Sequence, residues 1–327
     1  DGYETYNLEH AVLGVAGRLG DNVDWCIVHA FAFTGPFGPV NSALGYPNND
    51  EAGHLLDAKI DWHLTENFTL TAGRFIPPTS MTWNPHMMKV MHTINYPLIN
   101  NGGLLPLIVP SPMYQTGVML TAQASGLSLQ VGNFNGNDTV GGYDIDDIAV
   151  LGLSNTMDID KTKGTAAKIA YDAEGLHVAG WYFGEEASIQ WDPATSVNGF
   201  ADGKLDQWGV EVAYNSDSLL AQAQYLSSTL DLLDSNVDDN LVQSGWYAML
   251  GYQVSNMQFI YRYDFVNLDQ EELLIPEDYN EETAHTLGFN YLINPNVTLG
   301  VNYIFRDLEG VDANTDELAF ILETNLF

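Results

Sequence analysis

The chain has 327 residues, and its 10 Lys and Arg against 43 Asp and Glu give a formal net charge of −33. This excess of acid argues against nucleic acid and an anionic lipid surface as partners, because both require clustered bases. The acidity has two open interpretations, solubility or a salty habitat on one side and the attraction of cations on the other.

The single cysteine, Cys26, excludes an internal disulfide. The chain begins at Asp1 without a recognisable signal peptide, so we expect a secreted chain to be the mature form. No run approaches the ~18 consecutive apolar residues of a membrane helix. If the chain spans a membrane, it must therefore do so as a closed β-barrel, in which every backbone group finds a partner.

Segments of alternating polarity recur along the whole chain, each close to the ~9–11 residues that a tilted membrane strand needs. Residues 55–64 show the pattern, with Leu56, Ala58, Ile60, Trp62 and Leu64 on one face and Asp57, Lys59, Asp61 and His63 on the other. In chain order the predicted strands cover residues 8–19, 23–34, 55–64, 68–76, 114–124, 127–136, 165–171, 176–183, 205–214, 219–227, 241–252, 257–265, 283–292, 297–306 and 317–327.

The connections between these segments alternate in length. Turns of two to four residues follow every second segment, and loops of roughly ten to forty residues follow the others, as in outer-membrane barrels. Such barrels have an even number of strands when both ends lie in the periplasm. The 15 segments therefore predict an all-β barrel of about 16 strands, with 14 or 18 as alternatives, short periplasmic turns and long extracellular loops. The missing strand is expected before Leu8 or at residues 147–153.

Later segments repeat the division into two faces. In 257–265, an aromatic stripe from Met257 to Phe265 opposes Gln258, Arg262 and Asp264. Aromatic residues also gather at segment ends, which suits rings placed at the level of lipid headgroups. The alternative is a soluble sandwich whose apolar faces meet in a core, but the ionisable residues on the polar faces favour the barrel.

The stretch from Phe68 to Gly136 contains one exceptional connection, residues 77–113. It is rich in proline and glycine and carries many apolar residues, yet it has no Asp or Glu. Loops of this length in compact folds are usually functional or disordered. We predict a single barrel domain over residues 1–327 in which 77–113 folds inward as a constriction loop.

The same stretch resembles the phosphate-selective porin O and P type of Gram-negative outer membranes. The resemblance covers about a fifth of the chain, and the motifs that carry it are Gly73-Arg74-Phe75 with Pro77-Pro78, Tyr96-Pro97, Gln115-Thr116-Gly117-Val118 and Gly132-Asn133-Phe134-Asn135-Gly136. It implies a homotrimer of 16-stranded barrels in contact with lipid and lipopolysaccharide, each with its own pore narrowed by a long inward loop.

Two features depart from that family. Its phosphate-selective members carry a ladder of arginines and lysines, whereas this chain has 10 basic residues in all, so phosphate selectivity does not follow. Phe327 resembles the terminal aromatic residue read by barrel-assembly machinery. Glu323 and Asn325, however, stand where that signal usually has apolar residues.

Other constellations carry less weight. His86, Met87, Met88, Met91 and His92 have the soft ligands that suit Cu(I), but methionine also fills irregular gaps in packing. Acidic loops at 144–147, 158–160, 234–239 and 271–282 offer oxygen ligands for Ca²⁺ without EF-hand spacing, and solvated loops explain them as well. There is no G-x-S-x-G, HExxH or CxxC motif. We therefore predict neither an enzyme nor a bound cofactor.

These features predict an outer-membrane porin for passive diffusion of small hydrophilic solutes and ions. A barrel that sheathes a partner such as an outer-membrane cytochrome, and an anion-selective porin, are the alternatives. An acidic vestibule would gather cations, so we expect cation preference at low salt, ahead of a largely apolar throat. The predicted pore-lining residues are Asp57, Lys59, Asp61, His63, Arg74, His86, Lys89, His92, Glu211, Arg262, Asp264 and Arg306.

Overall fold

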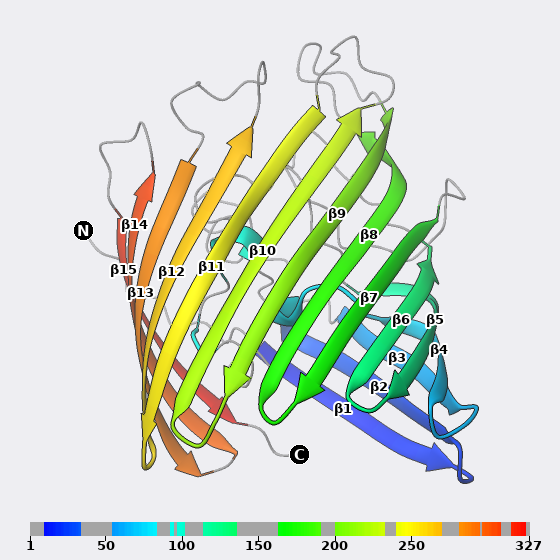
Figure 1. Ribbon diagram of the computed structural model, residues 1–327, viewed down its shortest axis with the longest axis horizontal. Helices are drawn as coiled ribbons and strands as arrows, with labels where there is room; N and C mark the ends of the chain where they lie inside the picture. The colour runs from blue at the N-terminus through cyan, green and yellow to red at the C-terminus, as the bar shows by residue number, and fades with distance from the viewer. Residues whose placement is uncertain are drawn as a thin grey trace.

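The computed structural model describes residues 10–33, 54–83, 92–94, 97–101, 114–135, 163–190, 200–232, 240–269, 281–294, 296–308 and 315–324. Fifteen strands form one antiparallel sheet, in which each strand pairs with its neighbours in the sequence. The strands are β1 (His10–Leu19), β2 (Val23–Phe33), β3 (His54–His63), β4 (Phe68–Phe75), β5 (Gln115–Ala124), β6 (Leu127–Phe134), β7 (Gly164–Ala173), β8 (Leu176–Gln190), β9 (Phe200–Asn215), β10 (Leu219–Leu232), β11 (Asn240–Val254), β12 (Met257–Asp269), β13 (Glu281–Asn294), β14 (Val297–Leu308) and β15 (Thr315–Thr324). Figure 1 shows the sheet strongly curved, with the short hairpin turns gathered at one end.

The fifteen predicted segments correspond one to one with the fifteen strands. The largest difference lies in length: β8 and β9 have 15 and 16 residues, several more than the alternation predicted. Their added parts carry Glu185, Glu186 and Lys204, so alternation of apolar and polar residues no longer marks the strand there. The regions proposed for a sixteenth strand lie outside the described residues.

The sheet exposes its apolar face and buries its polar one. On β12, Phe259 is 51% exposed, whereas Arg262 is 3% exposed and Asp264 is fully buried. A soluble sandwich would show the reverse distribution, so that alternative is wrong. Within the described part of the chain, no helix is long and apolar enough to cross a membrane.

Two of the short turns show why the hairpins form where they do. Ser125 and Gly126 join β5 to β6 with φ of 50° and 83°, and Glu174 and Gly175 join β7 to β8 with φ of 45° and 83°. Consecutive positive φ values define the type I′ turn, whose twist matches that of the strands it connects. Glycine in the second place removes the steric cost of this conformation.

Short elements of the long connection lie against the inner side of the sheet. They are the 3₁₀ helix η1 (Met81–Trp83) and the single-turn helix α3 (Leu98–Asn101), and α3 contacts β11, β12 and β13. Ile99 of α3 is 2% exposed and belongs to the main apolar cluster, together with Tyr247 and Met249 of β11. The core of the molecule therefore lies inside the curved sheet, between this connection and the wall.

Candidate functional site

The connection predicted as a constriction loop, residues 77–113, is described at 77–83, 92–94 and 97–101. All three described segments form hydrogen bonds with side chains of the strands. These contacts join residues more than a hundred positions apart in the chain, on the buried face of the sheet. The described parts of the loop thus lie against the buried face of the sheet.

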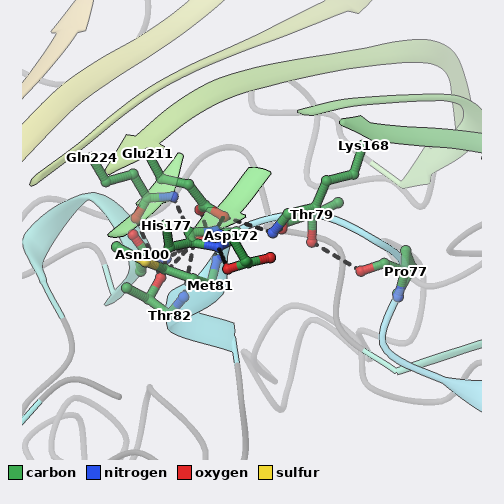
Figure 2. Close-up of polar contacts among 11 residues, drawn as sticks. Pro77, Thr79, Met81, Thr82, Asn100, Lys168, Asp172, His177, Glu211 and Gln224 are labelled. Carbon is green, nitrogen blue, oxygen red and sulfur yellow. Dashed lines mark hydrogen bonds and ion pairs between the residues drawn. The ribbon is translucent and has the colours of Figure 1, made fainter. Parts of the chain in front are cut away.

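Glu211 of β9 makes the first anchor of the loop. Its Oε2 accepts a hydrogen bond from the backbone N–H of Met81 at 2.8 Å, and its Oε1 lies 2.6 Å from Nζ of Lys168 on β7. Lys168 also donates to the carbonyl oxygen of Thr79 at 2.8 Å. Figure 2 shows these groups converging from two strands onto one turn of the loop.

Neutral side chains extend this first anchor. Gln224 of β10 donates to Oγ of Ser80 at 2.6 Å. The Asn100 side-chain amide of α3 donates to the hydroxyls of both Ser80 and Thr82. Because Asn100 lies in the last described segment of the loop, 97–101, these bonds join that segment to the first one, 77–83 (Figure 2).

Asp264 of β12 makes the second anchor. Its Oδ1 accepts from the backbone N–H of Leu98 at 3.2 Å, and its Oδ2 accepts from Nε of Arg262 at 2.8 Å. Arg262 donates in turn to the hydroxyl of Thr93. Asn290 of β13 adds a bond of 2.8 Å to the carbonyl oxygen of His92.

Each anchor contains a buried carboxylate whose charge must be compensated. Glu211 is 3% exposed and Asp264 is fully buried, and an isolated buried carboxylate is strongly unfavourable. Here each carboxylate has a base on the wall and a backbone N–H from the loop, so its charge and its lone pairs are satisfied together. Removing either partner would leave a buried charge uncompensated, which typically costs about 3–5 kcal/mol.

His92 is largely buried beside the second anchor. Burial lowers the pKa of His92 to about 4, against the opposite and smaller effect of its side-chain hydrogen bond with Gln258. Its backbone has φ of 55°, in the left-handed region. The imidazole is therefore neutral at physiological pH.

Eight of the twelve predicted pore-lining residues divide into two groups. Glu211, Arg262 and Asp264 lie beneath the loop, and Arg306 of β14 pairs with Glu317 of β15 at 3.2 Å. The second group, Asp57, Lys59, Asp61 and His63, lies on β3. His86 and Lys89 fall outside the described residues.

The β3 group belongs to a more open charged cluster. His63 Nε2 lies 2.9 Å from Oδ2 of Asp24, whose Oδ1 lies 2.6 Å from Nε of Arg18. Asp61 accepts a hydrogen bond from Thr71 of β4. The side chains of Arg18, Asp24 and His63 keep 60%, 34% and 38% of their surface exposed. This side of the wall is thus much more accessible than the side under the loop.

Arg74 is separated from this cluster by the register of the strands. It pairs with Ala58 on β3 and Thr116 on β5, which share the face of Ile60 and Val118. Its Nε donates to the carbonyl oxygen of Leu55 at 2.8 Å. The alternation therefore puts Arg74 on the face opposite to that of Lys59 and Asp61.

The predicted pore-lining set left out several residues of the first anchor. His177 of β8 bridges two acids, with Nδ1 2.7 Å from Oδ1 of Asp172 and Nε2 3.3 Å from Oε1 of Glu211. Gln224 and Asn100 were not distinguished by any motif. The absence of acid from residues 77–113 was the one signal in the sequence that pointed to this region.

No cluster of three metal-ligating His, Cys, Asp or Glu side chains occurs among the described residues. Four members of the candidate Cu(I) group, His86, Met87, Met88 and Met91, lie outside the described ranges. Most of the acidic loops considered for Ca²⁺ lie outside them as well.

Several solved porins have a similar fold. An anion-selective porin from Comamonas acidovorans superposes with a TM-score of 0.62 at 11% identity, over 98% of this chain and 87% of that chain. The trimer form of OmpT from Vibrio cholerae gives 0.60 at 12% identity, over 96% and 87% of the two chains. OmpF from Salmonella typhi, in complex with daunomycin, gives 0.60 at 15% identity, over 96% and 89%.

Comparison with curated proteins gives no match to the sequence. The similarity to solved structures, at these low identities, establishes the porin fold alone. The evidence for the family comes from the sequence: the family model for phosphate-selective porins O and P matches residues 3–326, nearly the whole chain. The chain therefore belongs to the family of phosphate-selective porins O and P, and it is a protein of the bacterial outer membrane.

Proposed function

We propose that this protein is a passive diffusion channel for small hydrophilic solutes and ions. The observation that carries the proposal is the distribution of side chains, with an apolar outer face and a polar, ionisable inner face on a curved sheet. A membrane barrel needs this arrangement to hold water inside and lipid outside. The family consists of channels rather than enzymes, which agrees with the absence of a catalytic motif in the sequence.

Planar-bilayer recording tests this proposal. The purified protein should give stable conductance steps, because an aqueous path crosses the membrane. Electrical silence in repeated, correctly folded preparations would contradict it. A stoichiometric partner recovered by pull-down together with that silence would support the sheath function instead.

We propose further that the channel prefers cations at low salt. The charge of −33 favours cations in any narrow aqueous mouth. Three of the inward bases do not oppose this strongly, because Lys168, Arg262 and Arg306 each form an ion pair with a carboxylate. The Comamonas porin is described as anion-selective, but its 11% identity carries no selectivity over to this chain.

The reversal potential in a KCl gradient tests the selectivity. Exposed charges are screened over a Debye length of ~8–10 Å near physiological salt, so cation preference should weaken as salt rises. Anion preference at both low and high salt would contradict the proposal and favour the phosphate or anion role that the family name suggests.

We also propose that the protein forms a homotrimer through the outer faces of β5 and β6, which are neighbours in the sheet. Exposed aromatic rings occur widely on β8 to β14, including Tyr182, Trp208, Trp246, Phe259 and Phe305. The large exposed side chains on β5 and β6 are aliphatic, and they are Val118, Leu120, Leu127, Leu129 and Val131. A membrane face without interfacial aromatic rings suits contact with protein better than contact with lipid headgroups.

A further inference from the structure

We infer that Glu211 and Asp264 are positioning residues that fix the inward loop and thereby determine the width of the channel. This inference rests on the proposed channel function. It assigns these two carboxylates, which the sequence suggested as pore-lining groups, to holding the loop instead. The geometry of the two anchors carries it.

The anchors repeat one arrangement on strands that are not neighbours. On β9, Glu211 pairs with Lys168 and accepts from Met81 N; on β12, Asp264 pairs with Arg262 and accepts from Leu98 N. In each case one carboxylate oxygen faces the base and the other faces the loop. Two such points, 17 positions apart in the loop, restrain its start and a second point near its middle.

The bases complete the anchors by contacting the loop themselves. Lys168 donates to the carbonyl oxygen of Thr79 and Arg262 to the hydroxyl of Thr93. Each base therefore donates hydrogen bonds both to a carboxylate of the wall and to the loop. These two inward bases thus serve as parts of the loop's support rather than as ligands for a passing anion.

The composition of the loop follows from the same electrostatics. Residues 77–113 contain no Asp or Glu in a chain with 43 of them. An acid next to Met81 or Leu98 would face a buried carboxylate at low dielectric and repel it strongly. A loop held by backbone N–H groups on two wall carboxylates must therefore exclude acids near its contacts.

An apolar packing contact lies beside the second anchor. A Cβ on Gly245 of β11 would come within 2.4 Å of the carbonyl oxygen of Phe265 and within 2.9 Å of Cδ1 of Ile99, so glycine allows the close approach of β12 and leaves room for this side chain. The polar anchors and this apolar contact jointly fix α3 against the wall. Loss of one anchor should loosen the loop without releasing all of it, and loss of both should enlarge the opening further.

The test compares Glu211→Ala, Asp264→Ala and the double variant with wild type. Single-channel conductance and the size limit for uncharged polymers report the width of the channel. We expect both to increase in each single variant, with conductance substates, and to increase most in the double variant. Unchanged conductance and size limit in folded variants would overturn the inference.

Asp206→Ala is the matched control. Asp206 pairs with Nζ of Lys204 at 2.6 Å, the same distance as in the Lys168–Glu211 pair. It lies one residue from the buried Gln207 on β9, and therefore on the outer face of that strand. Its removal should leave the polymer size limit unchanged; an equal increase would show that loss of any such ion pair loosens the barrel.

Glu211→Gln and Asp264→Asn cover the case in which the alanine variants fail to fold. They keep the side-chain shape and one acceptor oxygen but lose the charge, so they should give smaller increases. Heat-dependent migration in electrophoresis identifies the folded barrels.

Hydrogen exchange separates failure of the anchors from failure of the channel. The amides of Met81 and Leu98 should be protected in wild type and should exchange about tenfold to hundredfold faster when their charged acceptor is removed. These exchange rates can be measured even if the protein shows no channel conductance. Fast exchange at both amides in wild type would overturn the anchor assignment even if the channel conducts.

Discussion

Gly73 shows how strictly one residue of this wall is constrained. It has φ of 128° within β4, and a Cβ there would lie 2.2 Å from the carbonyl oxygen of Ala58. The next strand therefore approaches closer than any side chain allows. Gly73 also belongs to the motif that carries the resemblance to the family, which gives that part of the motif a physical cause.

Gly73→Ala should lower the stability of the barrel by roughly 1–3 kcal/mol, the usual cost of a strained backbone, and by more if the strands must separate. Urea unfolding of the detergent-solubilised protein measures this. Gly20→Ala is the control, since Gly20 also has positive φ, 63°, but nothing lies within 4 Å of its added Cβ. Equal losses in the two variants would contradict the steric explanation.

His92 predicts a dependence of loop docking on pH. Its pKa is about 4 in the folded protein, below its ordinary value of 6.5. A group whose folded pKa is lowered in this way disfavours the proton, so docking is strongest above pH 6.5 and weakens as the pH falls toward 4. The full effect is about 3 kcal/mol.

The measurement is hydrogen exchange across residues 92–94 between pH 7 and pH 4, corrected for intrinsic rates. His92→Asn removes the titration and tolerates the left-handed backbone. Gln258 and Asn290, its polar neighbours, do not titrate in this range. The variant should lose the pH dependence; if it keeps the dependence, another group is responsible.

At the scale of single residues, the sequence predicted which side chains face inward but not which groups they bind. Alternation put Glu211, Arg262 and Asp264 on the inner face, and all three are buried there. It gave no sign of their partners, because Met81 is 130 positions from Glu211 and Leu98 is 166 from Asp264. Periodicity is a property of one strand, whereas an anchor depends on two distant segments.

At the scale of elements, strands and turns were the most predictable features. Every strand repeats a period of two, and turns such as Ser125–Gly126 have residues that accept positive φ. The ends of β8 and β9 were missed because their residues beyond the apolar band have no reason to alternate. The short helix α3 was missed for a different reason, since a single turn has no helical period to detect.

The α3 helix yields a prediction of its own. Ile99→Ala should weaken the docking of this element by about 2–4 kcal/mol, since it leaves a cavity against β11. Faster hydrogen exchange of residues 97–101, with unchanged exchange in the strands, is the expected result. Leu318→Ala, at a residue 56% exposed on β15, serves as the control. Unchanged exchange in Ile99→Ala would show that the polar anchors alone hold the helix.

At the scale of the whole molecule, the uneven outer surface predicts how copies associate. Val131→Trp and Leu120→Trp add bulk to the aliphatic face of β5 and β6, which should hinder a tight contact between protomers. Leu250→Trp adds the same bulk to β11, where aromatic rings are common and Leu250 is 60% exposed. Mass measurement in detergent should show dissociation in the first two variants only. Intact trimers in all three would place the interface elsewhere.

Along these strands, side chains suited to lipid alternate with side chains suited to water. This alternation has a consequence for the chain before it folds. The apolar residues are interleaved with polar ones, so the mean hydropathy is only −0.09. A translocation machinery that retains long apolar helices finds no segment to hold in the inner membrane. The chain can therefore pass through one membrane as an ordinary polar polypeptide and acquire its apolar surface only when the strands pair in another.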